Sequence, residues 1–485
     1  MLFDRVKSLD KILEAAEKKS LKRQLGWFQL TMMGIAAIIG MGIFVLTSQA
    51  IHKAGPSMLI SLVITSAVCG VTALIYSEIS SMIPVSGSAY TYSYGVLGEF
   101  IAWFVGWALI LEYAIAAGGV AVGWSGYVNA LLVKADLALP LALTAGPGDV
   151  IGDTGVKGTF NLLAFALALL VTWLLVLGTS KSAKVTAVLV IFKIAALALF
   201  VILTVPNADL AHFTPMFPNG WGTPLSGTGV LGAAALIFFA FVGFDAVSTA
   251  TEETINPNRN IPIGLIASLS ICAIFYMLIG YGAIGALGGQ PGGELATSKH
   301  ALSYVLDRIG HPNAGSFVAM AASLSMPAVV LMMIYGQTRI LFAMSRDGLM
   351  PSAFSKVHPR YQTPHVVTII TGLFVAFFAA IYPTATLAEI SNTGTLAAFA
   401  TVAIGVMVLR VKQPNRPRPF RTPMIWVLGP LTVIGCVVLF LSLGWDPTIK
   451  YFCIWSVTGI AIYFLFARKH SLIGKELAAE KQLEA

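Results

Sequence analysis

The chain contains 485 residues, of which 57% are hydrophobic and 11% are charged, and its formal net charge is +8 at pH 7. Soluble domains carry about 25% charged residues, so this composition excludes a soluble protein and indicates a polytopic membrane protein. The four cysteines lie far apart in apolar stretches, which indicates neither a disulfide framework nor a metal site.

Apolar stretches of about 20 residues are long enough to span a bilayer as helices. The polar segment 1–26 comes before the first of them and lacks the apolar run of a cleavable signal peptide, and a polar tail, 469–485, follows the last. The chain has twelve such stretches, at residues 27–52, 57–83, 97–131, 159–179, 184–205, 229–252, 261–288, 313–343, 365–383, 386–411, 424–446 and 449–468.

The distribution of charge predicts where the chain ends lie. An even number of spans puts both termini on one side, and most of the 30 basic residues fall in the terminal segments and in the loops on that side. Cytoplasmic loops carry an excess of Lys and Arg, so we expect a multi-pass cell-membrane protein with both termini in the cytoplasm. The same distribution explains the positive net charge without a nucleic-acid partner.

The first span is interrupted by glycines. The uncharged stretch from Thr31 to Ser48 contains Gly34, Gly40 and Gly42, and a glycine inside a helix costs roughly 1 kcal/mol relative to alanine. We predict a break in the helix there, because irregular backbone inside a bilayer is tolerated where it lines a cavity or is buried in protein. The alternative is that these glycines only allow close helix packing.

A matching break is predicted in the sixth span, where a glycine and an aspartate interrupt an apolar run. Unwound backbone at the membrane midplane is what transporters use to hold the charged ends of a solute. We therefore expect the α-carboxylate of a substrate at the first break and its α-amino group at the second. The predicted binding residues are Ile39, Gly40, Met41 and Gly42 in the first break and Phe239, Ala240, Phe241, Val242 and Gly243 in the second.

The spacing of the two breaks predicts the architecture. They lie five spans apart, which is the spacing that a 5+5 inverted repeat requires. The transport core is then 27–411, with repeats at about 27–205 and 229–411. The last two spans, within 424–468, contain no charge inside the membrane and are interpreted as accessory helices.

Three features are candidate gates. The small and aromatic segment 84–94 is predicted to be a cytoplasmic loop that either closes the bundle or forms a simple turn. A ring beside the second break, Phe239 or Phe241, is predicted to close over the solute from outside. Glu252 and Glu253 are predicted to pair with an arginine that follows the eighth span as a cytoplasmic latch, or else to stay solvated.

Ionisable residues inside spans are costly and mark functional sites. Lys193 lies near the middle of the fifth span, and its predicted partners are Glu112 in the third span and Asp245 just after the second break. Burial favours the neutral form of a lysine, so these three residues are the proton-coupling candidates. A permanent ion pair with a structural role is the alternative.

The sequence contains no residue pattern that supports catalysis. It has no Ser-His-Asp array, no glycine-rich phosphate loop and no His/Cys metal spacing. We therefore expect no enzyme, including one that acts on lipids, and no cofactor other than protons as the coupling ion. A channel is disfavoured because the sequence has no repeated selectivity filter.

The motifs around these residues resemble those of the amino acid–polyamine–organocation superfamily, in particular the bacterial branch of its cationic amino acid transporters. The resemblance runs nearly end to end and is carried by segments 34–44, 85–92, 241–249 and 335–339. It implies an all-α integral membrane protein with twelve transmembrane helices in a LeuT-like 5+5 inverted repeat, with broken helices 1 and 6 and two accessory helices. It also implies that Lys193 stands where sodium-coupled relatives bind an ion, and hence proton coupling.

The chain departs from that family at two positions. The first break reads Gly40-Met41-Gly42, where the family often has Gly-Thr-Gly, and Ala108 stands four residues before Glu112, where members that take cationic amino acids can carry an aspartate. Both changes make the predicted pocket, which includes Ala108 and Glu112, more apolar. The expected function is proton-coupled import of L-amino acids with neutral or cationic side chains. The alternative is an exchanger or sensor that binds the same ligands without proton coupling.

Overall fold

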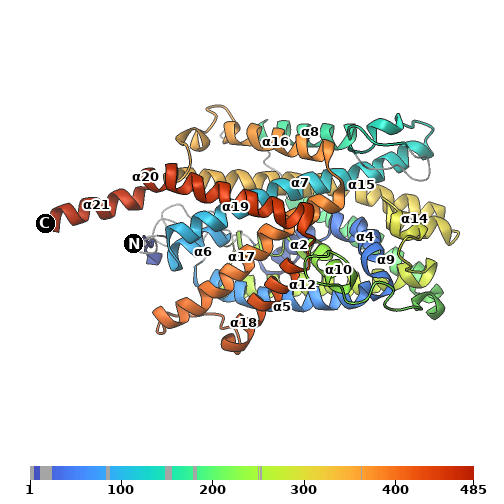
Figure 1. The fold of residues 1–485 in the computed structure, drawn as a ribbon, viewed down its shortest axis with the longest axis horizontal. Helices are drawn as coiled ribbons and strands as arrows, with labels where there is room; N and C mark the ends of the chain where they lie inside the picture. Colours follow the sequence, from blue (N-terminus) through green and yellow to red (C-terminus); the bar gives the residue numbers. More distant parts are fainter. Residues whose placement is uncertain are drawn as a thin grey trace.

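The computed structural model describes residues 5–10, 12, 25–83, 88–147, 156–177, 183–249, 251, 254–361 and 363–484. In this part of the chain the regular secondary structure is helical, which confirms the all-α class. Many of the helices run along the long axis of the molecule, and both termini lie at the same end of it (Figure 1). This placement agrees with an even number of membrane crossings.

Each predicted span contains at least one apolar helix. Seven helical stretches of the described residues are long and apolar enough to cross a membrane, and five more are shorter apolar helices. The helices in the twelve spans are α2 (Trp27–Ile38) with α3 (Met41–Phe44) and α4 (Leu46–Ala54), α5 (Met58–Met82), α7 (Glu99–Lys134), α8 (Leu162–Leu177), α9 (Ala183–Thr204), α10 (Gly229–Ile237) with η6 (Phe238–Phe241) and α11 (Ala246–Thr249), α12 (Pro257–Leu287), α15 (Pro312–Arg346), α16 (His365–Ile381), α17 (Thr384–Lys412), α18 (Ile425–Leu441) and α19 (Lys450–Ile462).

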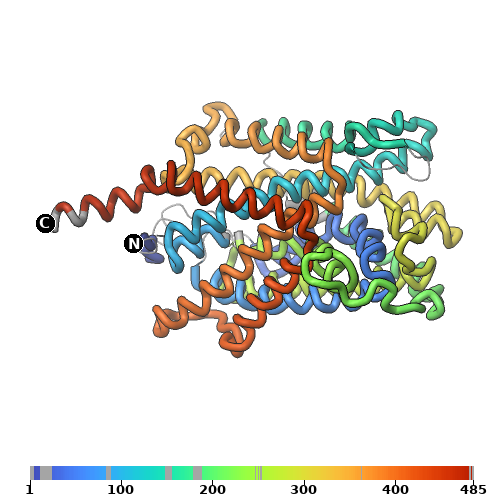
Figure 2. Tube along the Cα trace, viewed as in Figure 1, coloured from blue at the N-terminus to red at the C-terminus, as the bar shows by residue number. Residues whose placement is uncertain are grey.

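Both spans in which a break was predicted are interrupted. α2 is separated from α3 by two non-helical residues, and η6 is followed by a turn before α11. α8 and α16 pack side by side along one edge of the bundle (Figure 2). The inverted symmetry between 27–205 and 229–411 stays a prediction.

Helices also form where loops were expected. The segment predicted as the cytoplasmic loop 84–94 overlaps α6 (Ser88–Val96). Tyr90 and Tyr94 are buried there with their rings in edge-to-face contact, 5.9 Å apart between centroids. Residues four apart share one helix face, so burial of both rings favours a helix over a loop. The predicted latch residues, Glu252 and Glu253, lie outside the described residues.

The second accessory helix is attached to α7 by tryptophans. The rings of Trp107 in α7 and Trp455 in α19 are stacked, with 4.5 Å between their centroids. Each indole N–H donates to the backbone carbonyl of the other residue, at 2.8 and 2.9 Å. This reciprocal contact explains how a helix outside the predicted core is held in place.

A buried ion pair ties α5 to α17. Glu78 is fully buried and accepts two hydrogen bonds from the guanidinium of Arg410, at 2.9 and 2.6 Å. The same carboxylate accepts from the N–H of Thr422, at 2.8 Å, and lies 3.3 Å from a guanidinium nitrogen of Arg418. Such a fully bonded carboxylate has a structural role.

Replacement of Glu78 by glutamine is expected to lower the stability of the protein by about 3–5 kcal/mol, because it leaves the largely buried guanidinium of Arg410 without its counter-charge. The measurement is the thermal unfolding temperature in detergent. Partial recovery in the double variant Glu78→Gln/Arg410→Gln would support the assignment. An unchanged unfolding temperature in Glu78→Gln would contradict it.

Candidate substrate site at two helix breaks

The first break separates α2 from α3. The last helical hydrogen bond of α2 runs from the N–H of Ile39 to the carbonyl of Ile35 (2.9 Å). Ile39 and Gly40 then leave helical geometry, with φ/ψ of −73°/99° and −148°/−145°. The helix resumes at Met41 and continues past Val45 into α4. Helix ends leave backbone N–H and C=O groups without helical partners, so the break supplies polar backbone within an apolar span.

The second break follows η6. Val242 is extended, with φ −61° and ψ 139°, and Gly243 has a positive φ of 110°, which residues with a Cβ rarely adopt. A Cβ at Gly243 would also lie 3.0 Å from the carbonyl oxygen of Ala37 in α2. Glycine is required here both by the backbone turn and by the close approach of the two broken helices.

The two breaks are in direct contact. A Cβ at Gly42 would overlap the Cα and Cβ of Ala240. Gly34 lies just as close to α11 and α12, so the packing interpretation is correct for that glycine. Gly40 differs, because a Cβ there would lie 3.4 Å from its nearest neighbour, a methyl group of Val329. Of these three glycines, Gly40 therefore has space beside its Cα.

Lys193 of α9 holds the end of α2. Its ammonium donates hydrogen bonds to the carbonyl oxygens of Ala36 (3.1 Å) and Ile39 (2.8 Å), and the residue is 2% exposed. The carboxyl end of a helix carries partial negative charge, which compensates the buried cation. Lys193 and Glu112 both belong to the described part of the chain and form no ion pair there, so that predicted pairing is wrong. The predicted pairing with Asp245 stays a prediction. Backbone carbonyls freed by the break are the hydrogen-bond partners that the structure gives the ammonium.

Three polar side chains that were not predicted from the sequence also meet carbonyls beside the breaks. The hydroxyl of Tyr276 in α12 lies 3.1 Å from the carbonyl oxygen of Ile38 and 3.0 Å from that of Ala240, and so links the two breaks. Asn392 of α17 donates to two carbonyls of α10, and Tyr127 of α7 donates to a carbonyl of α3. The helices around the breaks thus fix the irregular backbone by side-chain hydrogen bonds.

The structure brings Glu112 and Asp245 together. Both residues are buried, and their carboxyl groups are close enough to interact electrostatically. The phenol groups of Tyr76 and Tyr113 interact with both of them. Within the described ranges, one carboxylate oxygen of Glu112 is buried without a hydrogen-bond partner. The two predicted carboxylates therefore share one buried region.

Two residues that were predicted to make the pocket apolar have different surroundings. Ala108 belongs to a buried cluster with Leu111 and Phe452 that joins α7 to α17 and α19. The Met41 side chain lies against α7, where a Cβ at Gly123 would be 2.7 Å from its Cγ. The roles of Met41 and Ala108 in the pocket stay predictions.

The structure distinguishes the two candidate gate rings. Phe241 is completely buried, and its ring contacts that of Tyr276 edge to face, with 5.1 Å between centroids. Phe239 is 6% exposed. A ring packed in this way is fixed, so Phe239 is the better candidate for a ring that moves.

Ion pairs connect helices at both ends of the bundle. At the end far from the termini, the ammonium of Lys53 in α4 lies 2.7 Å from the carboxylate of Glu389 in α17. At the other end, Asp347 after α15 pairs with Lys7 of the N-terminal segment (2.8 Å) and accepts from the hydroxyl of Tyr90 in α6 (2.8 Å). Ion pairs therefore hold the helix bundle together at both of its ends.

Comparison with known proteins identifies relatives over almost the whole length. The family model described as amino acid permease matches residues 25–466. The chain is 44% identical over 475 residues to the branched-chain amino acid permease BcaP of Bacillus subtilis (strain 168), which covers 97% of this chain and 99% of the relative. It is 39% identical over 472 residues to the methylthioribose transporter of the same strain, with the same coverage of 97% and 99%.

A more distant relative is the vacuolar cationic amino acid transporter 2 of Arabidopsis thaliana, with 33% identity over 427 residues, which cover 86% of this chain and 64% of the relative. These relatives are named as permeases and transporters, not as enzymes. The family match includes both helix breaks and Lys193. The chain therefore belongs to the amino acid permease family of the amino acid–polyamine–organocation superfamily.

Proposed function

We propose that this permease imports L-amino acids together with protons, by exposing the paired helix breaks alternately to the two sides of the cell membrane. The observation that carries the proposal is the pair of hydrogen bonds from the Lys193 ammonium to the carbonyls of Ala36 and Ile39. A cation bonded to the backbone of a helix break can control the geometry of that break. The termini are proposed to lie in the cytoplasm, as the basic residues indicate.

The backbone of the two breaks is proposed to hold the charged ends of the substrate. The α-carboxylate would bind at Gly40–Gly42, where the start of a helix carries partial positive charge and where Gly40 leaves space. The α-amino group would bind carbonyls at Phe239, Ala240 and Val242. The carbonyl oxygen of Ala240 already accepts a hydrogen bond from the hydroxyl of Tyr276. It has a second lone pair, which can accept a hydrogen bond from the substrate ammonium.

Proton coupling is proposed to act through the charge of Lys193. When protonated, the side chain donates two charge-assisted hydrogen bonds, which are roughly twice as strong as neutral ones, and fixes the end of α2 against α9. This state would be outward-open or occluded. Loss of the proton toward the cytoplasm would weaken both bonds and free α2 to move, which would open the inward path.

The preferred side chain is proposed to be neutral and aliphatic. Met41 contributes an apolar surface at the first break and packs against α7. The relative with 44% identity is named a branched-chain amino acid permease, whereas the relatives named for cationic amino acids, such as the Arabidopsis transporter, are less similar. Cationic side chains remain part of the expected range, with lower affinity.

An exchanger or sensor without proton coupling is the alternative function. An obligate exchanger has no need of a titratable group at the break, and Lys193 is such a group. The two functions differ in one measurable property, because an exchanger moves labelled substrate into vesicles only when amino acid is present on the inside.

Substrate class can be tested by competition. Uptake of radiolabelled leucine into proteoliposomes should be inhibited by neutral aliphatic amino acids, more weakly by cationic ones, and hardly at all by methylthioribose, which lacks both an α-carboxylate and an α-amino group. Strong inhibition by methylthioribose, with none by amino acids, would contradict the proposal that the breaks bind a zwitterion.

Replacement of Phe239 by alanine is expected to weaken substrate affinity by about tenfold, because a ring that closes over the solute excludes water and loses contact area when truncated. Phe239→Tyr should have a mild effect. The control is Phe241→Ala, whose ring packs on Tyr276, so its main effect should be on thermal stability. Substrate affinity measured by binding to purified protein decides the matter, and unchanged affinity in Phe239→Ala would exclude this gate.

A further inference from the structure

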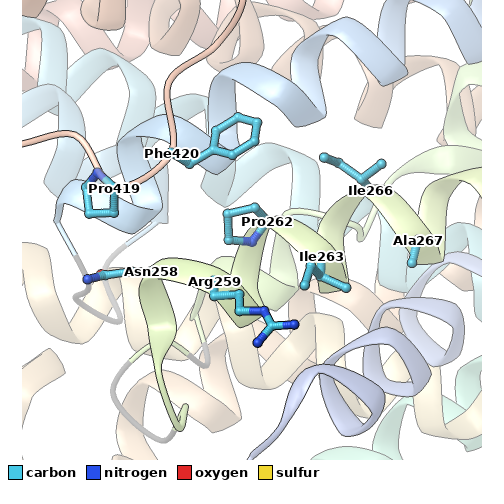
Figure 3. Close-up of a pocket in the computed structure, with 8 residues that line it drawn as sticks. All are labelled: Asn258, Arg259, Pro262, Ile263, Ile266, Ala267, Pro419 and Phe420. Atoms are coloured by element: carbon cyan, nitrogen blue, oxygen red, sulfur yellow. The ribbon is translucent and has the colours of Figure 1, made fainter.

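A groove lies between the first turns of α12 and the segment that leads into α18 (Figure 3). Its volume is about 520 Å³. One wall is the apolar face of α12 formed by Pro262, Ile263 and Ile266, and Phe420 stands across the groove from them. Arg259 lies one turn before Pro262 and brings a guanidinium to the same groove. The groove therefore combines an apolar wall with a cationic end.

The groove lies at the end of the bundle that carries the N-terminus. The N–H of Ile255, just before α12, donates to the carbonyl of Leu25, just before α2 (2.8 Å). Arg416, in the segment that leads into α18, pairs with Asp10 (3.0 Å). The helices α2, α12 and α18 thus all begin at this level.

Exposed aromatic residues mark this level as a membrane interface. Trp27 at the start of α2 is 53% exposed, and Trp426 at the start of α18 is 60% exposed. Tryptophans are enriched where apolar spans meet lipid headgroups. The cationic end of the groove therefore lies at headgroup depth, and its apolar wall continues toward the hydrocarbon core.

One guanidinium group of the groove lining is available for a ligand. Arg259 is exposed, and within the described ranges it has no ion-pair or side-chain hydrogen-bond partner. Two arginines of the segment before α18 are engaged elsewhere, since Arg416 binds Asp10 and Arg418 lies 3.3 Å from Glu78. Arg259 is therefore the cation that the groove offers to a ligand.

We propose that this groove binds one anionic phospholipid. Its phosphate would meet Arg259, and one acyl chain would lie along Ile263 and Ile266. Arginines hold phosphates by paired hydrogen bonds, and basic pockets beside transmembrane helices bind anionic headgroups. A free phosphate or nucleotide would leave the apolar wall in water, so the structure favours a lipid. The bound lipid would stabilise α12, the helix from which Tyr276 links the two breaks.

The test is native mass spectrometry of purified protein extracted from bilayers that contain phosphatidylglycerol and phosphatidylethanolamine. We expect wild type to retain one phosphatidylglycerol, and Arg259→Gln to retain about tenfold less. Ile266→Trp, which fills the groove without changing its charge, should lower retention similarly. Lys356→Gln removes an exposed basic residue elsewhere and should match wild type.

Three outcomes would overturn the proposal. They are no retained lipid in wild type, equal retention of the zwitterionic lipid, and wild-type retention in Arg259→Gln. If Arg259→Gln loses the lipid and Ile266→Trp retains it, the lipid is attracted by charge in general. That result would also exclude binding in the groove. Arg259 is exposed, so its replacement should leave folding intact, and lipid mass is read independently of transport.

Discussion

Replacement of Lys193 by alanine is expected to abolish accumulation of amino acid driven by a pH gradient. The ammonium donates two hydrogen bonds to the carbonyls of Ala36 and Ile39, and hydrogen bonds to charged groups contribute about 1.5–3 kcal/mol each. The variant loses both hydrogen bonds and the group that carries the proton. A gradient of one pH unit is worth about 1.4 kcal/mol, or about tenfold accumulation per proton. The variant should reach only the external concentration, while binding and counterflow persist.

Two further variants distinguish the effect of the positive charge at residue 193 from the effect of proton release. Lys193→Arg keeps a positive charge that is not released in proteins, so it should bind substrate yet fail to accumulate it. Tyr276→Phe removes a hydroxyl that contacts both breaks but carries no coupled proton, so accumulation should become slower and stay dependent on the gradient. Gradient-driven accumulation by Lys193→Ala at near wild-type rates would contradict the proposed route and point to Glu112.

Replacement of Gly42 by leucine is expected to eliminate substrate binding. A Cβ at this position would overlap the backbone of Ala240, so even Gly42→Ala must push the two breaks apart. Overpacking of this kind costs typically 1–3 kcal/mol, and the geometry that holds both ends of the substrate is lost with it. Gly42→Ala should weaken binding by at least about tenfold, and both variants should unfold at lower temperature than wild type.

The matched control is Gly40→Ala, in the same break. A Cβ there would lie 3.4 Å from a methyl group of Val329, so the helices should pack as in wild type. Its effect on thermal stability should be small, and any loss of affinity would report on the space beside the substrate carboxylate. Native affinity in Gly42→Leu would place the substrate site elsewhere in the protein.

The helix breaks could be predicted because their signal is local. Glycines and a carboxylate within an apolar span have no use in lipid, so Gly40, Gly243 and Asp245 indicate irregular backbone from the chain alone. The apolar lengths likewise predict twelve spans. α6 was missed because its tyrosines fold into a helix only when the rest of the bundle buries them.

The partners at the breaks could not be predicted because they depend on tertiary packing. Lys193 was expected to face a carboxylate or a water cavity, and the end of α2 supplies carbonyls whose partial charge has the same sign as a carboxylate. Tyr276 and Asn392 are polar residues within long apolar helices, and the sequence shows only that each needs a partner. Which backbone group each one meets depends on how α12 and α17 lie against the breaks.

The most direct test of the account is uptake of radiolabelled leucine into proteoliposomes that contain no amino acid, with and without an inward proton gradient, while internal pH is recorded by a dye. Proton-coupled import predicts accumulation above the external concentration only with the gradient, acidification that follows substrate addition, and loss of both with a protonophore. Uptake that requires amino acid inside the vesicles, or that ignores the gradient, would contradict it.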